Sequence, residues 1–156
     1  MNRWILLVAL VLVQVNTYAE DAFGANLVLN PPPGVTAIDA YFQASAMGGF
    51  MCNTAYSMAK NLAAIGETDP KKLSKGDFQG CIQQFTSSLK TLHTRAQKTL
   101  KTPAQKKALK EHFVLEITAL QGITPLAQER VIDYERRTNA ENRSVEQQKN
   151  RFDAEQ

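Results

Sequence analysis

Four residues of the chain carry chemically versatile side chains that are rare in it: Cys52, Cys81, His93 and His112. His112 and Glu116 are four residues apart, which is the spacing that places two metal ligands on one face of a helix. A metal site needs more ligands than this pair, and His93 alone remains to supply another imidazole. We therefore expect no metal site and interpret the pair as part of a helix surface.

The sequence offers few other routes to catalysis. It contains no GxSxG, no HExxH and no glycine-rich phosphate loop. A haem held between a methionine and a histidine is not predicted, because no spacing in the sequence singles out one such pair of ligands. The absence of a CxxCH motif excludes covalent c-type haem. Most acidic residues of the C-terminal part lie in a strongly polar stretch, which does not favour a glycosidase pair facing a cleft. We predict a protein that is not an enzyme and has no catalytic residues, metal or cofactor.

The N-terminal residues 1–19 are typical of a secretory signal peptide. Arg3 precedes an apolar run from Trp4 to Val13, and Thr17-Tyr18-Ala19 has the small-x-small form of a cleavage site. The run is shorter than the ~20 residues that a membrane span requires. We predict cleavage after Ala19 and a periplasmic or secreted protein with no transmembrane segment after cleavage.

Export places Cys52 and Cys81 in an oxidising compartment, where an even number of cysteines favours pairing. There is no CxxC motif, and no histidine is close to either cysteine in the sequence. We predict a structural disulfide, which the chain-entropy model values at about 3.5 kcal/mol for a loop of this length.

Hydrophobic residues recur with helical periodicity and not with the alternation of strands. The pattern predicts helices over residues 37–65, 75–101 and 103–121 and a fourth from residue 125. The fold class that follows is all-α, a disulfide-stapled helical bundle of three to four helices.

Three helix starts carry capping signals. Thr36 precedes the first helix, with Asp39 at its third position. Ser74 and Asp77 repeat that pattern before the second helix. Thr102, Pro103 and Gln105 form the clearest signal of the three.

The helical bundle domain is predicted to cover residues 37–137, with a separate segment on each side of it. Residues 20–36 contain three consecutive prolines and are predicted to form an extended N-terminal arm. Residues 138–156 are predicted to form a polar C-terminal tail or a frayed helix. A sparse seven-residue repeat runs into this extension: Val131, Thr138, Val145 and Phe152.

The predicted disulfide conflicts with a simple antiparallel hairpin of the first two helices. In such a hairpin Cys52 and Cys81 would be ~12 Å apart along the axis, given a rise of about 1.5 Å per residue. A disulfide needs Cα atoms within about 7 Å. We therefore expect the connector to return along the first helix, the first helix to bend or end before Asn61, or the crossing angle to be steep.

Positive charge is concentrated in the middle of the chain. Residues 60–110 contain eleven basic and three acidic side chains. Lysines early in a helix oppose its dipole, which suggests that the cluster has a use. Nucleic acid is not expected as the partner, because no aromatic residues are interleaved with the cations. The predicted contact residues for an acidic envelope or secreted protein are Lys90, Arg95, Lys98, Lys101, Lys106, Lys107 and Lys110.

These observations favour an exported, non-catalytic protein-binding module of the cell envelope, such as an inhibitor, immunity or chaperone-like protein. One alternative is a carrier of a small apolar ligand, with a cavity between helices lined by the Met- and Gly-containing first helix. Another is a structural subunit of an envelope or secretion assembly, with residues 131–152 as its contact seam.

Overall fold

The computed structural model describes residues 29–66 and 77–156. They form a four-helix bundle, which confirms the predicted fold class. Its helices are α3 (Ala37–Ala64), α5 (Phe78–Thr99), α6 (Pro103–Gly122) and α7 (Val131–Ala154). The predicted signal peptide, most of the predicted arm and the predicted cap Ser74 lie outside the described residues.

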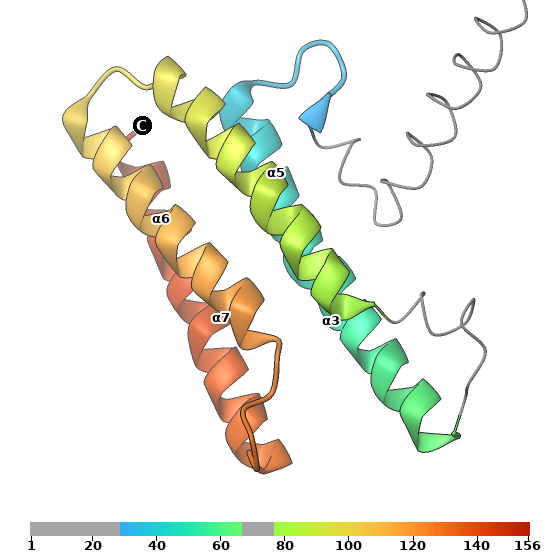
Figure 1. The fold of residues 1–156 in the computed structure, drawn as a ribbon. Coiled ribbons are helices and arrows are strands. Elements are labelled where there is room, and N and C mark those ends of the chain that lie inside the picture. Colours follow the sequence, from blue (N-terminus) through green and yellow to red (C-terminus); the bar gives the residue numbers. More distant parts are fainter. Residues whose placement is uncertain (1–28, 67–76) are drawn as a thin grey trace, which may run out of the picture.

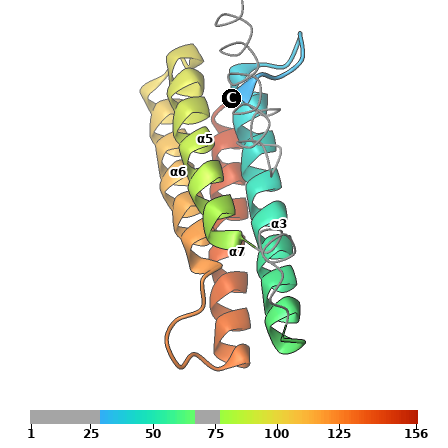
Figure 2. The same cartoon turned by 45° about the vertical axis from the view of Figure 1, so that its right-hand side comes forward.

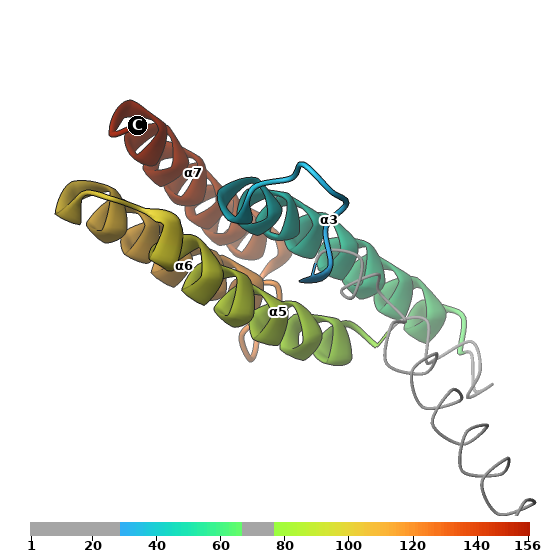
Figure 3. The ribbon, with the colours of Figure 1, turned by 90° about the horizontal axis from the view of Figure 1, so that it is seen from above.

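Successive helices run in opposite directions and pack as two close pairs (Figure 1, Figure 2). Helix α3 packs along α5, and α6 packs along α7. The pairs meet mainly through α5 and α6 and to a lesser extent through α3 and α6, whereas no Cα atom of α3 lies within 8 Å of a Cα atom of α7. The view from above shows α3 and α7 as neighbours on the side of the bundle away from the α5–α6 hairpin (Figure 3).

The disulfide between Cys52 and Cys81 is confirmed, with Cα atoms 5.5 Å apart. Cys52 lies twelve residues before the end of α3, and Cys81 lies three residues after the start of α5. These separations correspond to about 18 Å and about 4.5 Å of helix. The end of α3 therefore projects past the start of α5 (Figure 1), and the helix does not end before Asn61. The connector itself, residues 67–76, lies outside the described residues.

The core is formed mainly by the apolar stripe of α5, as its periodicity predicts. Phe85, Leu89, Leu92 and Ala96 are all buried against α3 and α6. Gly48 of α3 is part of this packing, because a Cβ atom at that position would lie only 3.0 Å from the Phe85 ring. Burial of this kind contributes about 1.5–3 kcal/mol for each large side chain.

Two of the three predicted caps are confirmed. The Thr36 hydroxyl accepts a hydrogen bond from the Asp39 amide at 3.1 Å, and Thr102 and Gln105 form a complete capping box. The second prediction is wrong in its residue: the N-cap of α5 is Asp77, whose carboxylate accepts the Gly80 amide at 2.9 Å. An aspartate can cap directly, so Asp77 begins the helix three residues later than expected.

Residues 138–156 are not a tail, and the bundle does not end at residue 137. Helix α7 starts at Val131, later than expected, and continues to Ala154. Its last turns pack closely, because Phe152 is fully buried and Gln148 donates hydrogen bonds to the Ala108 carbonyl oxygen at 3.3 Å and to Glu111 at 3.0 Å. These long-range contacts hold a helix whose own sequence is mostly polar.

The loop between α6 and α7 is tied to α7 by Arg137. Its guanidinium donates to Glu129 at 2.8 Å and to the Gly122 carbonyl oxygen at 2.7 Å. It also lies 3.6 Å from the Glu141 carboxylate. The hydrogen bonds from Arg137 hold the pKa of Glu129 at about 2, far below its usual range.

Replacing Arg137 with lysine is expected to loosen this loop, because an ammonium group cannot make two parallel hydrogen bonds to Glu129. The melting temperature should fall by a few degrees in a calorimetric scan. Arg136→Lys is the matched control, since Arg136 is exposed and has one ion pair, to Asp133 at 3.6 Å. Equal effects of the two substitutions would contradict the role assigned to Arg137.

Candidate functional site

The seven basic residues singled out in the sequence all lie exposed on the α5–α6 hairpin. We call them the basic hairpin surface. The turn between the helices is short, so the cations nearest to it are brought together, whereas Lys90 lies further down α5. Lys107 approaches Glu111 at 3.9 Å, which is a weak exposed pair. The side chains of five lysines have no ion-pair or hydrogen-bond partner among the described residues: Lys90, Lys98, Lys101, Lys106 and Lys110.

Arg95 differs from the other six, because it contacts the N-terminal arm. Its Nη1 donates a hydrogen bond of 2.6 Å to the Leu29 carbonyl oxygen. Leu29 and Val35 also pack against the core. The structure therefore gives Arg95 a role in holding the described part of the arm on the bundle.

A small ordered cluster borders the basic hairpin surface. The His93 and Phe113 rings stack with their centroids 4.4 Å apart. Gln97 bridges the two helices, because its amide nitrogen lies 3.3 Å from His93 Nε2 and donates to the Lys106 carbonyl oxygen at 2.8 Å. Burial and the nearby charge of Lys110 lower the pKa of His93. The hairpin is thus a fixed scaffold for its lysines.

The opposite side of the bundle carries a groove between α3 and α7. Its main part is a cavity of about 380 Å³. Phe42, Ala46 and Gly49 of α3 line one wall, and Asn142 and Val145 of α7 line the other. We call this cavity the interhelical groove. It exists because α3 and α7 stand further apart than the other neighbouring helices.

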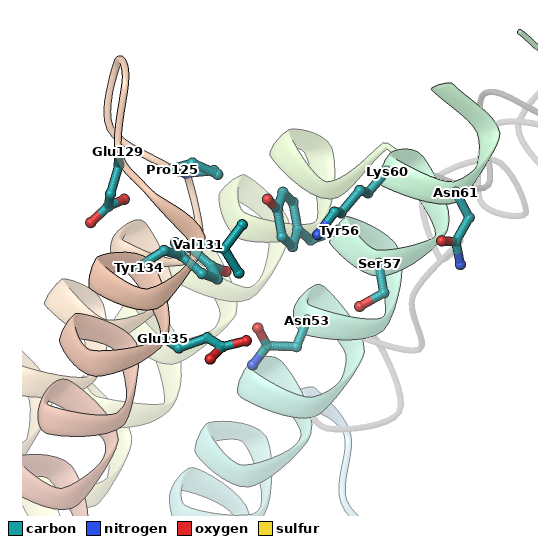
Figure 4. Close-up of a pocket in the computed structure, with 10 residues that line it drawn as sticks. All are labelled: Asn53, Tyr56, Ser57, Lys60, Asn61, Pro125, Glu129, Val131, Tyr134 and Glu135. Carbon is teal, nitrogen blue, oxygen red and sulfur yellow. The ribbon is translucent and has the colours of Figure 1, made fainter. Parts of the chain in front are cut away.

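A second cavity of about 350 Å³ lies at the far end of α3, where that helix projects past α5. Figure 4 shows Asn53 of α3 and Glu135 of α7 pointing toward each other across it. The rings of Tyr56 and Tyr134 are 5.6 Å apart at its base. Asn53 lines both cavities, so the two are adjacent along α3.

Three members of the seven-residue repeat also lie along these cavities. Val131 lines the second cavity, and Val145 lines the interhelical groove. Thr138 lines a small space between the two, and Phe152 is buried in the core. The proposed contact seam therefore faces α3 within the bundle.

The floor of the interhelical groove contains His112 and Glu116. The prediction that this pair belongs to the helix surface is wrong, because His112 is 1% exposed and Glu116 is 5% exposed. Spacing alone could not show which way α6 is turned. The burial of this pair could have been predicted from its spacing in the sequence relative to Leu109 and Leu120. Steps of three and four residues place all four side chains on one helix face.

His112 is held in one orientation by Tyr41. The Tyr41 hydroxyl and His112 Nδ1 are 2.8 Å apart, and Tyr41 is fully buried. Burial, reinforced by the charge of Lys149, lowers the pKa of His112 to about 4, so the ring is neutral. The buried phenol has no other acceptor among the described residues, so it donates to Nδ1 and the ring proton is on Nε2. Nε2 itself has no hydrogen-bond partner among those residues.

Glu116 is a desolvated carboxyl that has no cationic partner among the described residues. Burial raises its pKa to about 7, and a hydrogen bond from the Ser45 hydroxyl offsets only part of this rise. Near neutral pH the group is therefore present in both protonation states. Together with His112 Nε2, it gives the groove a floor that can donate hydrogen bonds.

In the part of the chain that the structure describes, no three His, Cys, Asp or Glu side chains are grouped so that they could hold a metal ion. Within the same ranges, no helix has both the length and the apolar character needed to cross a membrane.

The fold and its two surfaces define a disulfide-linked four-helix bundle with a basic hairpin and a groove on the opposite side. Comparison with protein families, curated proteins and solved structures finds no match for this chain.

Proposed function

We propose that the chain is an exported, non-catalytic protein-binding module of the cell envelope, periplasmic or secreted. The basic hairpin surface is its contact surface, and the partner is an envelope or secreted protein with an acidic surface. One observation carries this proposal: five lysines on one hairpin are exposed and lack a carboxylate partner among the described residues.

The physical argument rests on charge complementarity. Unpaired cations on a fixed scaffold attract an acidic surface over about one Debye length, or about 8 Å at physiological salt. Such attraction raises the rate of association more than it slows dissociation. Binding by this surface should therefore weaken as salt concentration rises.

The test is a double charge reversal near the hairpin turn. Lys106→Glu with Lys110→Glu is expected to slow association with the partner at least tenfold at low salt. The partner is first identified by native mass spectrometry of the full chain purified from its own host, and the rates are then measured by surface plasmon resonance.

The control is Arg143→Glu, which reverses one exposed charge on α7 away from the hairpin. It should leave the association rate nearly unchanged. Thermal stability should change little in the double variant, because neither lysine side chain makes a hydrogen bond or an ion pair with the described residues. Unchanged association after the double reversal would refute the proposal.

A carrier of small ligands is a second candidate function. It is supported by the interhelical groove, with its apolar walls and polar floor, because small-molecule sites combine these features.

A further inference from the structure

We propose that the interhelical groove binds the carboxylic acid group of a small amphipathic molecule. One carboxyl oxygen of the ligand accepts a hydrogen bond from His112 Nε2, and the other shares the proton of Glu116. The apolar part of the ligand lies along the walls formed by α3 and α7. This site is independent of the basic hairpin surface.

The hydrogen-bonding groups on the floor favour an acid over an amine. His112 Nε2 is a donor that faces the groove without a partner among the described residues. A ligand ammonium group would place a second donor against it and leave both unmatched. A carboxylate supplies the acceptor that His112 lacks. Its second oxygen can pair with Glu116 when that residue is protonated, as two carboxyl groups do when they share one proton.

The walls of the groove suit an apolar chain. Phe50 is 71% exposed and lines the groove, so it offers an aromatic surface that a bound apolar chain can contact. Gly49 leaves space in the wall, because a Cβ atom at that position meets nothing within 4 Å. A cavity of about 380 Å³ is within the usual range for small-ligand sites.

The charges around the groove leave Glu116 as the group that couples binding to pH. Helix α3 contributes no titratable side chain to the groove lining. Its Tyr41 is titratable but lies outside the lining, hydrogen-bonded to His112. From α7, Glu146 and Lys149 lie at the mouth, and Lys149 is paired with Asp153 at 2.6 Å. His93 of α5 affects the charge of His112 only from a distance. A carboxylate ligand should therefore bind the form of the protein in which Glu116 holds its proton.

The test is a titration of the full chain with octanoate, followed by calorimetry and by nitrogen–proton correlation NMR. The apparent Kd should be about tenfold higher at pH 8 than at pH 6, because Glu116 loses its proton across this interval. The His112 Nε2–H signal should shift on binding. Octylammonium should not bind. Failure of octanoate to bind at pH 6, or preferential binding of octylammonium, would overturn the proposal.

Three variants locate the site. Glu116→Gln should abolish the dependence of binding on pH, since the amide donates a hydrogen bond at every pH. Gly49→Leu should fill the groove and weaken binding at least tenfold without lowering the melting temperature. Arg143→Gln is the control, because its exposed side chain does not line the groove, and it should bind octanoate with the same dependence on pH as the wild type. Unchanged binding by Gly49→Leu would place the ligand elsewhere and refute the proposal.

Discussion

Replacing Phe152 with alanine is expected to lower the free energy of unfolding by about 3–5 kcal/mol. The side chain is fully buried, although it is four residues from the C-terminus of the chain. Its ring lies 5.2 Å from the Phe42 ring of α3, centroid to centroid. The substitution would leave a cavity where the last turns of α7 meet α3 and α6. Urea denaturation followed by circular dichroism measures the effect.

Val131→Ala is the control, because Val131 is in the first turn of the same helix and is 62% exposed. It should change stability by less than about 0.5 kcal/mol. A similarly small effect of Phe152→Ala would mean that residues 138–156 are the polar tail that their composition suggests, and that α7 contributes little to the core.

The C-terminal part of α7 could not be assigned from its own sequence. A helix is normally recognised by a recurring apolar stripe, and this segment has a single large aromatic residue near its end. Its stability comes from contacts with α3 and α6, such as those of Phe152 and Gln148. Contacts between segments far apart in the chain leave no periodic signal in either segment.

The features that sequence does predict here are local or covalent. The caps at Thr36 and Thr102 depend on residues three positions apart, so they can be identified before the fold is known. The α5 stripe extends over one continuous helix. The Cys52–Cys81 bond is predicted from the even number of cysteines and the predicted export, and the structure resolves the geometric conflict that it raises by extending α3 past the start of α5.

The interhelical groove is a different kind of feature. It results from the distance between α3 and α7, which no local pattern encodes. The lysines of the basic hairpin surface could be located from sequence because exposure is the usual state of a lysine. His112 and Glu116 were misplaced for the same reason, since a charged or polar pair on a helix is normally assigned to solvent.

The burial of His112 and Glu116 has a measurable effect on stability as a function of pH. When folded, His112 has a pKa of about 4 and Glu116 a pKa of about 7. In the unfolded chain the values return to about 6.5 and about 4.5. Between pH 4.5 and pH 6.5 the folded protein holds one proton on Glu116, and the unfolded chain holds one on His112. The two contributions to the pH dependence of stability therefore oppose each other across this range.

Comparing each single variant with the wild type isolates the contribution of the residue that was replaced, because the other residue is present in both proteins and its contribution cancels. In Glu116→Gln, the variant lacks the stabilisation that the wild type gains at low pH, where folded Glu116 holds a proton that the unfolded chain releases. Its stability relative to wild type should therefore fall by about 3 kcal/mol as the pH is lowered from about 7 to about 4.5. In His112→Gln the sign reverses, because the wild type alone loses stability at low pH, where the unfolded chain binds a proton at His112. Relative stability should then fall by a similar amount as the pH rises from about 4 to about 6.5.

The measurement is urea denaturation of wild type and both variants at half-unit steps from pH 4 to pH 8. Only the difference from wild type at each pH is used, so the cost of each substitution itself appears as a constant. His93 and Glu129 also have lowered pKa values and destabilise the fold as the pH falls, but they are present in all three proteins and their effects cancel. A difference that stays constant with pH for Glu116→Gln would mean that Glu116 is ionised in the folded protein at pH 5, in which case it could not share a proton with a ligand. A constant difference for His112→Gln would mean that His112 is not kept neutral in the folded protein.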